Sequence, residues 1–474
     1  MSLALLPPLA LGLSLALAHE EASQPAPLLV HEWGTFTCLQ DASGRALGGV
    51  NSDEEPVPAF VHRLFPLFLV GGPNAAVGML KGAPRCHPDV TLRLETPVAY
   101  FYPGAAHPNG LQLDVSVEFE RGWLTEWYPS ATPAHPAEAR AGSWKPGPIT
   151  AETRGGLSWN GLAVGGFAPG PPTDDPVWLS PRVEQASSIT TREGETERYL
   201  FYRGVAHLDA PLAVRTSSDG ERFELYAQLD PELGVGEGLP VLASWLVDVR
   251  ADGALAYREL GGLWLARDAG VLATTPSRFA PEDYAAEQLA PLRESMVAGL
   301  IVDGLYRAEA EAMLDTWEHA YLQAPGLRLF FLVPDAWTDA VLPLELSVPA
   351  QVERAMVGRI ELVTAEQREH LEQIAHTPYE DGDWFQDMCA ELEAAGRIDD
   401  LLRVQSSLLT GDLPELPAPY AVPDSYAAYL ELGRFRDALL LDELRQAPTE
   451  ALRLFAKAHG ICAWNGGLSA EATD

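Results

Sequence analysis

The sequence predicts an α+β protein, with a mostly antiparallel, β-sandwich-like body, inserted helices and a small C-terminal cap of helical hairpins. Residues 111–119 (LQLDVSVEF) alternate apolar and polar side chains, the period expected of a strand with one buried face. Short apolar runs bounded by turns continue to about residue 260, without the strand-helix alternation of a doubly wound sheet. From about residue 383 the pattern is helical, with two turns at 395–397 and 432–434, spaced near the ~34-residue period of a helical repeat.

The first part of the chain contains further strand signals. Residues 28–39 predict a strand, and the turn sequence DASGR at 41–45 separates it from a short run at 46–50. Residues 92–102 predict another strand, in which Pro97 requires an edge position or a bulge because proline cannot donate to the ladder. The Pro- and Gly-rich segment 129–181 predicts long ordered loops or an excursion between sheets.

A second block of strands follows, and then the pattern becomes mixed. Asp252-Gly253 is typical of a hairpin turn between two strands. Pro281 indicates a helix start, and Thr364 with Gln367 forms a capping-box sequence for a later helix. The predicted strands are 198–205, 212–216, 222–229, 244–250, 254–260, 327–333 and 355–363, and a helix is predicted at 306–322.

The domain organisation begins with a predicted signal peptide. Residues 1–18 form a short apolar run ending in Ala-Leu-Ala, which a signal peptidase reads, and the run is shorter than the ~20 residues of a membrane span. We therefore expect an exported protein, periplasmic or extracellular, with no transmembrane segment after signal cleavage. The expected divisions are a signal peptide at 1–18, a flexible leader at 19–29, a β-rich body at 30–278, a mixed α/β segment packed on it at 279–377, and the helical cap at 378–474.

The charge of the chain restricts its partners. Its 67 acidic and 32 basic residues produce a formal net charge of −35, so the counterion-releasing basic surface that nucleic acid binding requires is lacking. The sequence therefore predicts no nucleic acid partner.

Four cysteines allow several states. Cys38, Cys86, Cys389 and Cys462 fall as two early and two late residues, and in an oxidising compartment they could pair within each half. Buried free thiols are the alternative. Cys38 is also a candidate nucleophile with a histidine, His31 or His62, as its base, although a disulfide to Cys86 is favoured over that role.

The stretch 30–62 carries the most reactive side chains. Two imidazoles and several carboxylates are suited to mixed N and O coordination of a divalent metal such as zinc or calcium. Adjacent residues of a strand point to opposite faces, so His31 and Glu32 cannot both join one site. A hydrogen-bonded core histidine and a solvated acidic turn at 53–55 are the structural alternatives. The candidate metal ligands are His31, Asp53, Glu55 and His62, and the candidate catalytic residues are Glu32 and Glu54.

Aromatic residues gather in the Pro- and Gly-rich region. Displayed on loops they could stack on sugar rings, and Trp144 and Trp159 are the candidate ligand-binding residues; they could equally anchor the core. Asp335, Trp337 and Asp339 form a second polar and aromatic group after a predicted strand, which a structural turn explains as well.

Several blocks of the sequence resemble a family of exported bacterial proteins to which no activity is assigned. The blocks include HEWGTFTCLQDASGRALGGVNSDEEPVPAFVHR, RLETPVAYFY, YLFYRGV, FFLVPDAWTDAVLPLEL and VGRIELVT, and they extend over much of 30–364. The resemblance implies export and supplies no catalytic residue, substrate or cofactor. Outside it, AYLELGRFRDALLLDEL resembles a tetratricopeptide unit.

Two functions remain open. The first is a noncatalytic extracytoplasmic binding or scaffold protein, with a glycan or a cell-envelope protein as partner. The alternative is a metal-dependent hydrolase that uses the stretch from His31 to His62. The sequence leaves open whether the protein is an enzyme and what its oligomeric state is.

Overall fold

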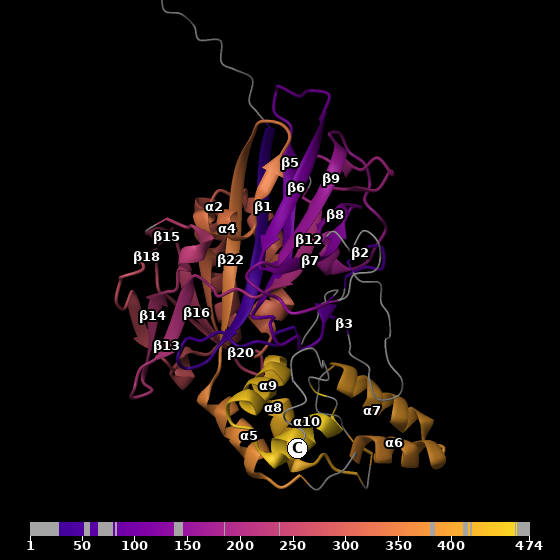
Figure 1. Ribbon diagram of the computed structural model, residues 1–474, viewed down its shortest axis with the longest axis vertical. Helices are drawn as coiled ribbons and strands as arrows, with labels where there is room; N and C mark the ends of the chain where they lie inside the picture. Colours follow the sequence, from indigo (N-terminus) through magenta and orange to yellow (C-terminus); the bar gives the residue numbers. More distant parts are fainter. Residues whose placement is uncertain are drawn as a thin grey trace, which may run out of the picture.

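A nine-stranded sheet forms the centre of the protein (Figure 1). The computed structural model describes residues 28–51, 57–64, 79–80, 83–136, 146–183, 185–236, 238–379, 384–410, 416–417, 420–459 and 461. In this sheet β1 and β22 are parallel, and the other neighbouring pairs are antiparallel. The strand order is β17 (Leu255–Glu259), β16 (Ser244–Val249), β20 (Gly326–Val333), β22 (Ala350–Leu362), β1 (Leu28–Gln40), β5 (Leu92–Tyr102), β12 (Leu200–Ala206), β7 (Gly122–Tyr128) and β2 (His62–Arg63).

A second, antiparallel sheet packs on one face of the first. Its strands are β11 (Thr196–Glu197), β10 (Ile189–Thr190), β9 (Arg154–Val164), β6 (Leu111–Glu120) and β21 (Leu344–Leu346), with β8 (Thr132–His135) also paired to β9. The predicted alternation of β6 is confirmed, because its apolar residues from Leu113 to Phe119 are buried in the core that the two sheets share. The short helix α4 (Asp335–Val341) also contributes to this core.

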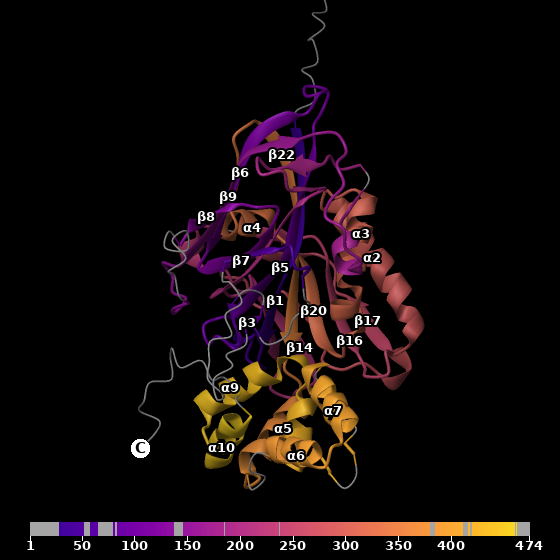
Figure 2. The same ribbon diagram turned by 90° about the vertical axis from the view of Figure 1, so that its right-hand side faces the viewer.

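Helices cover the opposite face of the nine-stranded sheet (Figure 2). They are α2 (Leu289–Val302) and α3 (Arg307–Trp317), which continues as the π-helical turn η5 (Glu318–Gln323). Apolar side chains of both helices pack against Trp33, Trp245 and Phe330 of the sheet. The body is therefore layered as helices, large sheet and small sheet, and both faces of the central strands are buried.

Smaller elements complete the body. They are the three-stranded sheet of β13 (Leu212–Thr216), β14 (Arg222–Ala227) and β19 (Ala273–Pro276), the pairs β15 (Leu239–Val241) with β18 (Leu263–Leu265) and β3 (Met79–Leu80) with β4 (Ala83–Pro84), the short helix α1 (Pro176–Leu179), and the single turns η2 (Pro231–Leu233), η3 (Pro281–Asp283) and η4 (Ala286–Gln288).

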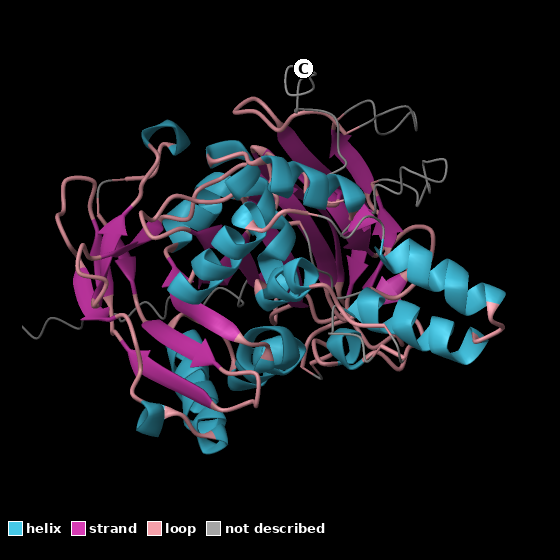
Figure 3. Ribbon diagram, turned by 90° about the horizontal axis from the view of Figure 1, so that it is seen from below, coloured by secondary structure: helices cyan, strands magenta, loops and turns pink. Residues whose placement is uncertain are grey.

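The C-terminal helices gather at one end of the sheets (Figures 1 and 3). The predicted capping box begins α5, since the Gln367 N–H donates to Thr364 Oγ1 over 3.2 Å. The two predicted hairpins are α6 with α7 and α8 with α9. The bounds are α5 (Ala365–His376), α6 (Trp384–Ala394), α7 (Ile398–Thr410), α8 (Asp424–Glu431), η6 (Gly433–Phe435), α9 (Arg436–Gln446) and α10 (Glu450–Ala458). Among the described residues, no helix combines the length and apolar character needed to cross a bilayer.

The fold class agrees with the sequence prediction, and two local predictions were wrong. Strand β9 lies inside the segment predicted as loops, where the glycines of RGGLSWNGLAV obscure its strand pattern. The short run at 46–50 contains an isolated bridge between Ala46 and Gln40. Strands β20 and β22 are central members of the large sheet, so the segment 279–377 helps to build the body instead of packing on it.

Pro97 lies in an interior strand, at a bulge. The register between β1 and β5 shifts opposite Gly34, where Thr96 has a positive φ of 46°. A Cβ at Gly34 would lie 3.0 Å from the Cα of Pro97, so glycine lets the bulge pack against β1. The bulge alternative of the sequence prediction is thus confirmed, because the extra residue removes the need for a ladder donor at the proline.

Candidate functional site

Strand β1 carries the polar residues of the HEWGTFT block through the most buried part of the molecule. From Val30 to Gln40 every residue is buried, because β1 lies between β22 and β5 and is covered on both faces. A buried polar group is costly unless it is hydrogen-bonded. The contacts of these side chains therefore decide whether they are available for chemistry.

His31 is on the face covered by α3. Its Nδ1 lies 2.8 Å from Oε2 of Glu309, a fully buried carboxylate. The same carboxylate accepts from the hydroxyl of Tyr102 over 2.5 Å and from the backbone N–H of Tyr306 over 2.7 Å. The imidazole thus joins β1 to the first turn of α3.

Further along the same face, two threonines contact one tyrosine. The hydroxyl of Tyr321 lies 2.6 Å from Oγ1 of Thr35 and 3.2 Å from Oγ1 of Thr37. Burial raises the pKa of Tyr321, and the nearby Glu95 raises it further, so this hydroxyl stays protonated. These contacts join β1 to η5.

Glu32 points to the opposite face and forms an ion pair. Arg354 of β22 donates from Nε to Glu32 Oε2 over 2.6 Å, and the Tyr202 hydroxyl donates to Oε1. Arg354 also donates from Nη1 to Asp339 over 2.9 Å. The prediction that His31 and Glu32 face apart is confirmed. Glu32 is closed to solvent and held by two donors, so it is not placed to act as the predicted catalytic residue.

The predicted metal site is not assembled by its described members. His62 is on the edge strand β2, where Nε2 lies 2.9 Å from both carboxylate oxygens of Glu195. Three strands separate β2 from β1, which at about 4.8 Å per strand places His62 roughly 19 Å from the strand of His31. The two imidazoles therefore cannot bind one ion, which corrects the prediction.

The remaining predicted ligands fall elsewhere. Asp53, Glu54 and Glu55 lie outside the described residues. Within the described part of the chain, no three His, Cys, Asp or Glu side chains are grouped so as to bind a metal ion.

Cys38 is a free, fully buried thiol, so the predicted Cys38–Cys86 disulfide is not formed. Burial raises the pKa of Cys38, and the carboxylates of Asp209 and Glu361 raise it further. The thiol therefore stays protonated, which argues against the nucleophile role. Cys462, the expected partner of Cys389, lies outside the described residues.

The aromatic residues predicted to bind a ligand are also placed differently. Trp159 on β9 is buried in the core between the sheets, and its Nε1 donates to the carbonyl of Pro129 over 2.9 Å. Its rings are therefore not presented to a sugar, and the core alternative describes it correctly. Trp144 lies outside the described residues.

An accessible groove lies on another part of the surface, between α2 and the end of β16. It has a volume of about 240 Å³ and is lined by Leu242, Trp245, Glu259, Ser295, Gly299 and Val302, among others. Trp245 forms part of its floor, donating from Nε1 to the Ser295 hydroxyl over 2.9 Å, and Ser295 donates to Glu259 over 2.6 Å. Val302 is 74% exposed at the rim. The groove thus combines apolar walls with a carboxylate and a hydroxyl.

A tryptophan stands beside the groove. Trp264 on β18 pairs with Pro240 of β15, and Leu242, the residue that follows β15, lines the groove. Trp264 is 60% exposed. A Cβ at Gly238 would lie 2.8 Å from the indole, so this glycine lets the ring approach the backbone closely. The indole therefore lies close to the backbone at Gly238 and is largely open to solvent.

Comparisons with known proteins add little to this geometry. No family model matches the sequence, and no curated protein matches it. Among solved structures, the Fcho1 Mu homology domain of Danio rerio with bound Eps15 peptide is similar at a TM-score of 0.27 and 9% identity, over 72% of this chain and 99% of that one. The yeast delta-COP-I mu-homology domain is similar at a TM-score of 0.26 and 10% identity, both complexed with a Dsl1 WxWxV peptide and without it. The match covers 72% of this chain in both cases, and 99% of the complexed and 98% of the uncomplexed domain. At such scores these likenesses assign no function.

A group of carboxylates beside the sheet was missed in the sequence. Asp303 at the end of α2 lies near Asp335 at the start of α4 and Glu353 on β22. Burial, together with the neighbouring carboxylates of Asp335 and Glu353, raises the pKa of Asp303 to about 7. Its Oδ2 atom is buried without a hydrogen-bond partner among the described residues. Asp335 was noted in the sequence because of its polar and aromatic neighbours in the chain. It was not connected with Asp303 and Glu353, because these residues are distant in the sequence.

We expect Asp303 to make stability depend on pH. Its pKa in the folded protein is above the ~3.9 of an unfolded aspartate, so the folded state binds more protons between these values. The contribution of Asp303 to the free energy of unfolding should therefore be largest below about pH 4. It should fall as the pH rises and be lost above about pH 7. Asp303→Asn should add roughly 1 to 2 kcal/mol at pH 8 and little at pH 4. Urea denaturation at both pH values measures this.

The exposed Asp268→Asn is the matched control, with little expected change at either pH. Equal stabilities of wild type and Asp303→Asn at pH 8 would show that the carboxylate is already solvated there.

Proposed function

We propose that this chain is an exported, noncatalytic binding protein whose ligand is a glycan, docked on Trp264 and in the adjacent groove. The observation that carries the proposal is the 60%-exposed indole, close to Gly238, beside a 240 Å³ groove of mixed polarity. The noncatalytic part of the proposal is supported by His31, Glu32 and His62, because these side chains bond to other residues of the protein.

The chemistry of the groove suits a sugar. A pyranose has apolar C–H faces that stack on aromatic rings, and hydroxyl edges that need donors and acceptors. Trp264 supplies the aromatic face, while Glu259 and Ser295 supply polar atoms. The volume is below the ~300 to 1,000 Å³ of pockets that enclose drug-sized ligands, so the groove suits one ring or one end of a longer polymer.

The noncatalytic part of the proposal rests on positions. The described catalytic candidates, Glu32 and Cys38, are buried. Among the described residues that line the groove, Glu259 supplies the carboxylate. Glycoside hydrolysis usually needs two carboxylates flanking the bond. The apolar run at 1–18 supports export, which brings the groove to the envelope or its surroundings.

Trp264→Ala tests the proposal. The probes are soluble peptidoglycan fragments, chitohexaose, cellohexaose and laminarihexaose, titrated by calorimetry. We expect at least one to bind wild type and to bind Trp264→Ala about tenfold or more weakly, corresponding to ~1.4 kcal/mol. The control is Phe167→Ala, since Phe167 is 73% exposed on a different part of the chain. The glycan proposal is wrong if no probe binds wild type, or if both variants lose binding equally.

A further inference from the structure

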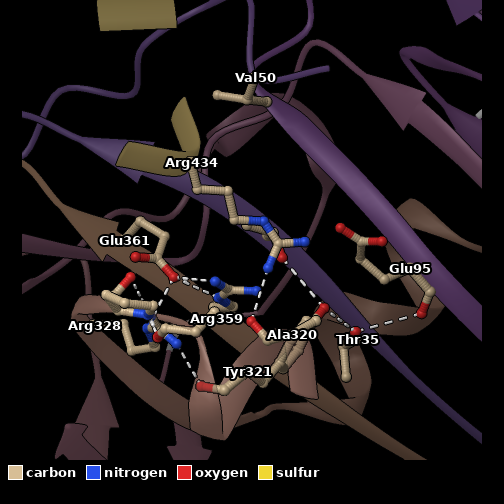
Figure 4. A network of polar contacts seen from close by, with 12 residues as sticks. Thr35, Val50, Glu95, Ala320, Tyr321, Arg328, Arg359, Glu361 and Arg434 are labelled. Atoms are coloured by element: carbon tan, nitrogen blue, oxygen red, sulfur yellow. Dashed lines mark hydrogen bonds and ion pairs between the residues drawn. The ribbon is translucent and has the colours of Figure 1, made fainter. Parts of the chain in front are cut away.

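Arginines converge where the C-terminal helices meet the helix-covered face of the large sheet (Figure 4). Arg328 on β20 and Arg359 on β22 are fully buried, and Arg434 on η6 reaches them from the C-terminal helices. Arg434 donates from Nη1 to the carbonyl of Ala320 over 2.7 Å. In a chain with a net charge of −35, such a concentration of buried cations needs a reason.

One carboxylate serves two of these guanidiniums. Arg359 donates from Nε to Glu361 Oε1 over 2.5 Å, and Arg328 Nε lies 2.9 Å from the same oxygen. These three side chains alone carry one surplus positive charge, whatever the partners of Arg434. Burial, with the nearby cations of Arg359 and Arg434, lowers the pKa of Arg328 to about 9 against the opposing effects of Glu361 and Asp248. A buried, uncompensated charge is costly.

The two guanidiniums differ in how fully they are bonded. Arg328 donates to the carbonyls of Tyr321, Ala324 and Pro325 in addition to its ion pair. Arg359 stacks on the ring of Tyr321 at 4.3 Å, but its Nη1 has no hydrogen-bond partner among the described residues. Figure 4 shows this guanidinium between Glu361 on one side and Arg434 on the other. An unused donor therefore faces a second cation.

We propose that a small, singly charged inorganic anion of the chloride class binds between Arg359 Nη1 and Arg434. Such an anion cancels the surplus charge of the Arg328, Arg359 and Glu361 group and accepts the unused N–H. A monatomic ion also suits a site enclosed by packed side chains better than a tetrahedral oxoanion. Because Arg434 comes from η6 and Arg359 from the sheet, the anion also strengthens the attachment of the C-terminal helices to the body.

Thermal unfolding of the full chain tests the site. Chloride is titrated against gluconate at constant ionic strength, with bromide and phosphate as further arms. We expect the midpoint temperature of unfolding to rise with chloride or bromide concentration until it saturates. In phosphate we expect the same midpoint temperature as in gluconate. Hydrogen exchange of α8 and α9 should slow in chloride. Crystals in bromide should show anomalous scattering beside Arg359 Nη1.

Variants separate this site from general salt effects. Arg359→Gln removes the donor and the surplus charge, so the chloride dependence should vanish. Arg434→Gln, at a half-buried position, should fold and weaken chloride affinity about tenfold. The control Arg307→Gln, at an exposed position, should keep the wild-type dependence. The proposal is overturned if wild type is equally stable in chloride and gluconate, or if Arg434→Gln responds to chloride as wild type does.

Discussion

Glu32→Ala is expected to lower the free energy of unfolding by about 3 to 5 kcal/mol, because it leaves Arg354 buried without its counterion. Burial alone lowers the pKa of Arg354, but Glu32 and Tyr202 outweigh this and hold it above its ordinary value, so the guanidinium stays charged. Tyr202 also loses its acceptor. Urea denaturation followed by tryptophan fluorescence measures the loss.

Two further variants make this result specific. Asp339 contacts the same guanidinium at 2.9 Å but is 63% exposed, so Asp339→Ala should cost less than about 1 kcal/mol. The double variant Glu32→Leu with Arg354→Met should recover most of the loss, because it removes both charges together. A Glu32→Ala protein as stable as wild type would instead restore the catalytic interpretation of this residue.

Glu309→Ala is expected to cost about 3 kcal/mol or more. The substitution removes the acceptor shared by His31, Tyr102 and the backbone of Tyr306, and a buried donor left unsatisfied costs ~1 to 3 kcal/mol. It also frees the first turn of α3 from β1. The measurement is again urea denaturation, combined with hydrogen exchange of α3.

Glu311 is the matched control on the same helix. Its carboxylate is half-exposed and pairs with Arg307 one turn away, so Glu311→Ala should change stability by less than about 0.5 kcal/mol. Similar losses in the two variants would mean that Glu309 contributes through helix propensity and not through the contact with His31.

The sequence reasoning succeeded where local signals and the final environment agree. Alternation along β6 reports one buried and one wet face directly, and the Thr364–Gln367 capping box is a contact within one turn. The hairpin at Asp252-Gly253 is also local, closed by Arg250 and Ala254. Strand β9 was not predicted because its glycines are typical of loops. Its neighbours in the sheet nevertheless hold it in an extended conformation.

Site prediction depended on distances that composition does not report. His31 and His62 lie 31 positions apart in the chain and share a suitable chemistry, but β5, β12 and β7 separate their strands. Conversely, the partners of His31 and Glu32 are Glu309 and Arg354, hundreds of residues away. No local sequence pattern predicts contacts between residues so far apart in the chain. The exposed Trp264 was missed because exposure, unlike residue type, follows from packing.

By itself, the sequence determined that a strand forms at 28–39 and that His31 and Glu32 face opposite ways, because both follow from β-propensity and the period of two. Only the tertiary structure decided that this strand lies at the centre of the large sheet, covered on both faces. That position converts reactive residue types into buried hydrogen-bonding partners, since a polar group without water must be satisfied by protein. The accessible groove between α2 and β16 is lined by residues outside the HEWGTFT block.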